Sequence, residues 1–75
     1  MEPYRNVAGN SGVDAYEIGA DYITIRFSDG AIYRYTYTSA GQENVERMKG
    51  LAQAGLGLNT FISTTVSKLY ERKVA

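Results

Sequence analysis

Tyr33-Arg34-Tyr35-Thr36-Tyr37 is the stretch that decides the fold, because three of the chain's seven tyrosines alternate within it. Successive side chains of a β-strand point to opposite faces, so this spacing predicts a strand with three rings on one side. Such a row serves either as a hydrophobic core with polar tips or as an exposed platform that stacks on bases or on a protein partner. The pairing with the neighbouring strand decides between these uses.

Three β-like runs, separated by short turn signals, include this stretch. They cover residues 13–19, 22–28 and 31–37 and are rich in isoleucine, tyrosine and threonine. Because the connections are too short to hold crossover helices, we expect an antiparallel meander. Residues 1–12 are interpreted as an N-terminal tail or a short lead-in strand, and a fourth strand is expected within them at residues 3–8.

The loop between the second and third runs determines which face of the sheet each tyrosine takes. A two-residue loop would place Ile25 opposite Arg34, which would bring a charged residue into the core at a high cost. A three-residue loop over residues 28–30 instead places Ile25 opposite Tyr33, and its glycine takes the left-handed conformation that such loops require. The second register predicts Tyr33 and Tyr35 in the core and Arg34 on the other face.

The second half of the chain changes to the helical period. Ser39 with Gln42 matches a capping box at the start of a first helix, Gly55-Leu56-Gly57 breaks that helix, and Asn59 is a suitable N-cap for a second one. Apolar stripes mark both helices. These segments predict one α+β domain over residues 13–73, in which an antiparallel meander of three or four strands is followed by two α-helices packed on one sheet face.

The composition excludes several kinds of site. The chain of 75 residues has no cysteine and no histidine, which excludes disulfides, structural zinc sites and a histidine or cysteine catalyst. Asp14, Glu17 and Asp21 gather near the first hairpin and are interpreted as solvated charges rather than as an acid–base pair. Gly55-Leu56-Gly57 lacks the further residues of a phosphate-binding loop. We therefore expect no enzymatic activity, no cofactor and no metal.

The charge balance bears on partners and location. Eight basic and eight acidic residues give a formal net charge of zero, which counts against a tight nucleic-acid binder, because such affinity comes from neutralised phosphates. The start of the chain shows no apolar run typical of a signal peptide, and no apolar stretch approaches the ~20 residues of a membrane span. We expect a cytoplasmic protein without membrane contact, either a monomer or a weak homodimer.

Several motifs resemble those of a known family. Ser28-Asp29-Gly30-Ala31-Ile32-Tyr33-Arg34-Tyr35 resembles the F-x-x-G-x-x-Y-x-Y core of the KTSC domain, a small domain found at the C-terminus of some lysyl-tRNA synthetases and alone in short bacterial proteins. Gly57, Asn59-Thr60-Phe61-Ile62 and Tyr70 resemble the family's later glycine, N-x-x-I segment and tyrosine. The resemblance covers roughly residues 13–70, and it implies that Tyr33, Tyr35, Gly57, Asn59 and Tyr70 maintain the fold.

Two departures from the family concern its expected binding surface. Thr38-Ser39-Ala40-Gly41 stands where the family often has Val-Pro, and Ser63 stands where a basic residue is frequent. The family's function is not established, and the synthetase context implies contact with RNA, tRNA in particular, only by analogy.

The sheet face opposite the tyrosines is the candidate binding surface. Its residues are Tyr22, Thr24, Arg26, Arg34 and Thr36. Arginines, threonines and an aromatic ring suit contacts to an RNA backbone, but the same face also suits a protein partner or plain solvation. Lys68, Arg72 and Lys73 are interpreted as partners of the second helix's dipole. We expect a non-catalytic binding module with weak RNA contact, or alternatively a protein-interaction or homodimerisation domain.

Overall fold

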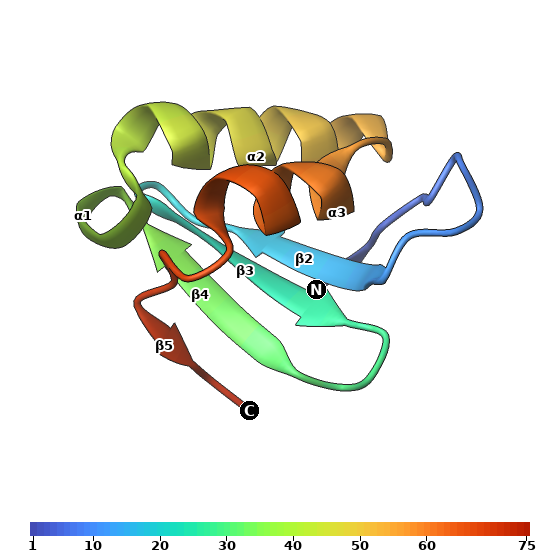
Figure 1. Cartoon of the computed structure of the whole chain (residues 1–75), viewed down its shortest axis with the longest axis horizontal. Coiled ribbons are helices and arrows are strands. Elements are labelled where there is room, and N and C mark those ends of the chain that lie inside the picture. Colours follow the sequence, from blue (N-terminus) through green and yellow to red (C-terminus); the bar gives the residue numbers. More distant parts are fainter.

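The computed structural model describes residues 1–75 and shows an antiparallel sheet with helices over one face (Figure 1). The sheet has five strands in the order β1-β2-β3-β4-β5. They are β1 (Glu2–Pro3), β2 (Val13–Ile18), β3 (Tyr22–Phe27), β4 (Ile32–Thr36) and β5 (Arg72–Lys73). The α+β class and the three-strand meander are confirmed. The strand expected at residues 3–8 was wrong in extent, since β1 ends at Pro3, and β5 was not predicted.

The turn between β3 and β4 has the predicted three-residue form. The Phe27 N–H donates to the Ala31 carbonyl at 2.8 Å, and Ile25 pairs with Tyr33 as the three-residue loop requires. Gly30 has φ +92°, which a residue with a side chain adopts only with strain. The register therefore turns Tyr35, which is only 2% exposed, toward the helices.

The helices begin directly after β4 and cover one face of the sheet, as predicted (Figure 1). They are α1 (Tyr37–Ala40), α2 (Gln42–Ala54), α3 (Leu58–Phe61) and a π-helical turn η1 (Ile62–Val66) that continues α3. The break between the predicted helices is confirmed, because α2 ends at Ala54 with Gly55 as its C-cap and α3 begins after Gly57. Tyr37 was expected to continue the strand row, but it opens α1 instead.

Both predicted helix caps were wrong. The capping box is formed by Thr36 and Ser39, whose hydroxyls each accept a hydrogen bond from the other residue's backbone N–H at 3.0 Å. Gly41, at φ +93°, then separates α1 from α2, so Gln42 starts a new helix instead of completing a box. Gly57, not Asn59, is the N-cap residue of α3.

The Thr36 cap can be tested through stability. We expect Thr36→Ala to lower the free energy of unfolding by about 1 kcal/mol, because Ser39 N–H loses its acceptor, whereas Thr36→Ser keeps it. Gln42→Ala is the matched control and should change the value by less than about 0.5 kcal/mol. Urea denaturation measures both, and a larger loss for the Gln42 variant would restore the capping box predicted from the sequence.

The core lies between the sheet and the helices. The sheet contributes Ile23, Ile25 and Tyr35, α2 contributes Val45, Met48 and Ala52, and the last helical segments contribute Leu58, Ile62 and Val66. Tyr4 joins this core from the N-terminal segment and is only 6% exposed. Arg5 donates hydrogen bonds to the carbonyls of Gln53 and Ala54 at the end of α2. Residues 4 and 5 therefore pack on the domain.

The C-terminal segment does not extend the last helix. η1 ends at Val66, and Arg72 and Lys73 form β5 beside β4. The prediction that these two residues compensate the helix dipole was wrong. Ser63 and Thr64 hydroxyls both donate to the Thr60 carbonyl. Such side-chain hydrogen bonds compete with the backbone hydrogen bonds of an α-helix. The π-helical turn η1 lies at the residues where they occur.

Candidate functional site

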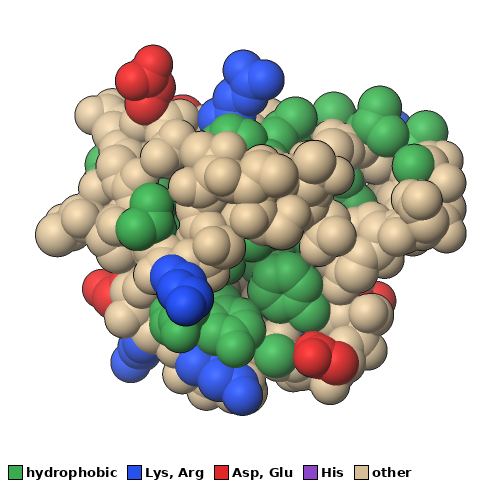
Figure 2. Space-filling model, viewed as in Figure 1, with side chains coloured by type: hydrophobic (Ala, Val, Ile, Leu, Met, Phe, Trp, Pro, Cys, Tyr) green, Lys and Arg blue, Asp and Glu red, His purple; other side chains and the backbone are tan.

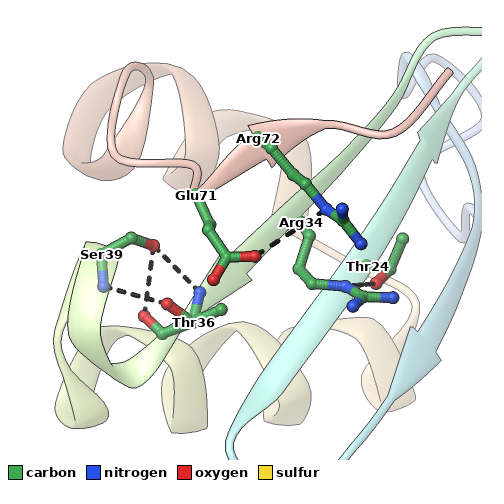
Figure 3. A network of polar contacts seen from close by, with 6 residues as sticks. All are labelled: Thr24, Arg34, Thr36, Ser39, Glu71 and Arg72. Atoms are coloured by element: carbon green, nitrogen blue, oxygen red, sulfur yellow. Dashed lines mark hydrogen bonds and ion pairs between the residues drawn. The ribbon is translucent and has the colours of Figure 1, made fainter.

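Three of the predicted binding residues meet on the sheet face that the helices leave open. The Arg34 Nε donates to the Thr24 Oγ1 at 3.2 Å, and the Arg34 Cζ lies 4.5 Å from the centre of the Tyr22 ring. A guanidinium above an aromatic face is attracted by the ring's negative quadrupole. These contacts hold the Arg34 side chain along the sheet (Figure 3). Thr24 is itself buried, with 2% of it exposed, so it supports Arg34 and is not a surface for a ligand.

The Tyr22 ring is held in turn by the first hairpin. A Cβ on Gly19 would lie 1.9 Å from the Tyr22 ring, so only glycine leaves room for the ring there. The Tyr22 hydroxyl donates to Glu17 Oε1 at 3.4 Å. The Tyr22 ring that contacts Arg34 is therefore itself positioned by Gly19 and by the Glu17 carboxylate.

Arg26 lies on the same face but has a partner of its own. Its Nε donates to Asp14 Oδ2 at 2.9 Å, in an ion pair whose side chains are 42% and 53% exposed. An exposed pair of this kind is worth only about 0–1 kcal/mol. Arg26 is therefore available to a competing anion, at a small cost.

Arg72 is a member of this face that the sequence interpretation missed. It lies directly opposite Arg34 in the pairing of β4 with β5, and Figure 3 shows both guanidinium groups on one side of the sheet. Glu71 Oε1 is 3.9 Å from Arg72 Nε and balances part of this charge. Like charges directly opposite each other destabilise a sheet, so an anion between them would be favoured.

Thr36 ends the row of predicted binding residues, but its side chain has a structural task. Its hydroxyl accepts the Ser39 N–H and caps α1 (Figure 3). A ligand on the open face would have to share this hydroxyl with the helix. The face available for binding is therefore centred on Arg34 and Arg72.

The motif tyrosines converge on a groove at the helix-covered side of the sheet. Tyr33 and Tyr70 have ring centres 4.6 Å apart, and the Tyr35 ring meets Tyr70 edge-on at 6.3 Å. Burial, together with the nearby Tyr33 and Tyr70, raises the pKa of Tyr35 to about 12, so its hydroxyl keeps its proton at neutral pH. Asn59 lines the same groove, and Gly57 caps the helix that carries it.

A second polar cluster joins α1 to α2. The Tyr37 hydroxyl donates to Glu46 Oε2 at 2.6 Å, and Lys49 Nζ lies 2.7 Å from the same oxygen. The hydrogen bond with Glu46 raises the pKa values of Tyr37 and Lys49, and the bond with Lys49 lowers the pKa of Glu46. Lys49 also donates to the Ala20 carbonyl. The cluster ties the first hairpin to the helices.

No three acidic side chains of the chain lie close enough together to hold a metal ion. None of its helices combines the length and the apolar character that crossing a membrane requires. No family model, no curated protein and no solved structure matches the chain. The resemblance to the KTSC domain thus rests on the motif residues themselves.

Proposed function

We propose that this chain is a small non-catalytic binding domain that contacts single-stranded RNA weakly through the open face of its sheet. The observation that carries the proposal is the juxtaposition of Arg34 and Arg72 across neighbouring strands, with Arg34 held on the Tyr22 ring. Guanidinium groups present several donors in a fixed plane, which suits phosphate oxygens. A phosphate between them would also relieve the repulsion of the two cations.

The expected affinity is low for two reasons. The chain has no net charge, so a phosphate backbone gains little from the protein as a whole. Arg26 must also leave Asp14 before it contributes. The resemblance to a domain of lysyl-tRNA synthetases supports RNA as the partner by analogy, and the absence of cysteine fits a cytoplasmic setting.

RNA is favoured over self-association by the edges of the sheet. Each edge strand, β1 and β5, has only two residues. Short edge strands are poor templates for pairing between sheets. The open face also carries charged groups where a stable homodimer would present an apolar surface.

The proposal is tested by titrating the ¹⁵N-labelled protein with single-stranded RNA and with tRNA at low and moderate salt. We expect the amide signals of residues 22–37 and 71–73 to move at low salt and to return as salt is added. Arg34→Gln and Arg72→Gln should each reduce the slope of log binding constant against log salt concentration by about 0.7. This is the contribution of one neutralised phosphate on a single strand.

Arg47→Gln is the matched control, because Arg47 is an exposed arginine of α2 on the opposite side of the sheet. It removes the same charge and should leave the slope unchanged. If the signals of residues 22–37 stay in place at low salt, the domain does not bind RNA through this face.

A further inference from the structure

A groove of about 390 Å³ opens between the sheet and the last helical segments. Its lining includes the aromatic side chains of Phe27, Tyr33, Tyr35 and Tyr70 and the polar side chains of Asn59 and Lys68. Figure 2 shows hydrophobic side chains gathered below the helices, with basic side chains beside them. A volume of this size is at the lower end for small-molecule sites.

The aromatic rings form one wall of the groove. Phe27 meets Tyr33 edge-on with ring centres 5.9 Å apart, and the centre of the Tyr70 ring lies 4.6 Å from that of Tyr33. Tyr70 is 38% exposed and belongs to the segment without regular structure between η1 and β5. The wall therefore presents aromatic surface to an incoming ligand, and a flat ring can stack there.

The lining of the groove includes a hydroxyl without a hydrogen-bond partner inside the chain, that of Tyr35. Tyr35 is only 2% exposed, and its hydroxyl is not among the tyrosine hydroxyls that hydrogen-bond within the chain, which are those of Tyr4, Tyr22 and Tyr37. No buried polar atom in the chain is left unsatisfied, so this hydroxyl must still reach the groove. A protonated hydroxyl here both donates and accepts hydrogen bonds.

The charge of the groove points to an anion. Lys68 lines it, and Lys73 Nζ lies 6.0 Å from the centre of the Tyr33 ring. Neither lysine forms an ion pair within the chain. The lysine that does form one is Lys49, which pairs with Glu46. No carboxylate lines the groove. A ligand that is negatively charged as well as flat would therefore be complementary to it.

We infer that this groove binds a nucleotide, with the nucleobase stacked on the tyrosine wall and the phosphate beside Lys68. The Asn59 amide can donate to and accept from a base edge, as asparagine does with adenine. Stacking a base on an aromatic side chain is worth about 1–3 kcal/mol. The nucleotide is either free or one unit of an RNA strand, since both have the same base and phosphate.

This inference does not depend on the RNA contact proposed for the open face. Tyr33 and Arg34 are neighbours on β4, so their side chains point to opposite faces of the sheet. Variants of Arg34 and Arg72 therefore test the open face, and variants of Tyr35 and Lys68 test the groove.

The test follows the ring signals of Phe27, Tyr33 and Tyr70 by NMR while AMP, UMP, adenosine, uridine or inorganic phosphate is added. We expect both nucleotides to shift these signals, the nucleosides to bind more weakly, and phosphate alone to leave the rings unmoved. A short single-stranded RNA forms a further arm. Ring shifts with RNA only would assign the groove to a nucleotide unit of a strand, and shifts with AMP or UMP would assign it to the free form.

Two variants connect the shifts to the groove. Tyr35→Phe keeps the ring and removes the hydroxyl, and Lys68→Gln removes the charge at the rim. Each should weaken nucleotide binding about three- to tenfold, the equivalent of one hydrogen bond, while Arg47→Gln should not weaken it. The inference is overturned if neither nucleotides nor RNA move the ring signals, or if both variants bind as the unaltered chain does.

Discussion

Tyr35→Ala is expected to lower the free energy of unfolding by about 3–5 kcal/mol. Tyr35 is only 2% exposed and belongs to the core cluster that joins the sheet to α2. Truncation would leave a cavity that the surrounding strands and helices cannot fill completely. Because a small domain has little stability in reserve, much of the protein should then be unfolded at 25 °C. Urea denaturation followed by circular dichroism measures the change.

Tyr35→Phe is the control that separates the ring from the hydroxyl. The tyrosine hydroxyls that hydrogen-bond within the chain are those of Tyr4, Tyr22 and Tyr37, so removal of the Tyr35 hydroxyl should cost less than about 1 kcal/mol. A loss below about 1 kcal/mol for Tyr35→Ala, the usual outcome at surface sites, would contradict the core position and return the tyrosine row to the role of an exposed platform.

The central meander was predictable because its register depends on local features. The length of one loop and the high cost of burying Arg34 were enough to place Tyr35 inside. The structure confirms that pairing, with Ile23 opposite Tyr35. Turn chemistry and alternation act over a few residues, and a single sequence displays both.

The C-terminal strand was not predictable from such local signals. Arg72 and Lys73 follow a helical pattern, and β5 forms because the returning chain finds free backbone groups on β4. The Glu71 N–H donates to the Arg34 carbonyl at 2.7 Å. A two-residue strand made by tertiary hydrogen bonds leaves no periodic pattern in the sequence.

The candidate site likewise has a part that was predictable from local sequence and a part that was not. Tyr22, Thr24 and Arg34 were grouped from the alternation of β3 and β4, and the structure brings them into contact. Arg72 joins them only through β5. The groove was missed for the same reason, since the contact of Tyr70 with Tyr33 requires the chain to return along β4 after η1.

Tyr4→Ala is expected to destabilise the domain by about 3–5 kcal/mol, although residues 1–12 resemble a tail in sequence. The Tyr4 side chain is 6% exposed and belongs to the core. Its hydroxyl accepts the backbone N–H of Leu58 at 3.3 Å. Leu58 is the first residue of α3, and such an N–H has no partner within its own helix. The substitution therefore opens a cavity and also removes a helix-capping acceptor.

Two matched variants divide this effect. Tyr4→Phe keeps the ring and should cost about 1 kcal/mol, because the Leu58 N–H loses its acceptor. Val7→Ala changes a side chain in the same segment that is 64% exposed, and should cost less than about 0.5 kcal/mol. If Tyr4→Ala were as mild as Val7→Ala in urea denaturation, residues 1–12 would be a dispensable tail. A large loss for Tyr4→Ala alone would make the N-terminal segment part of the hydrophobic core, because only a buried ring explains that difference.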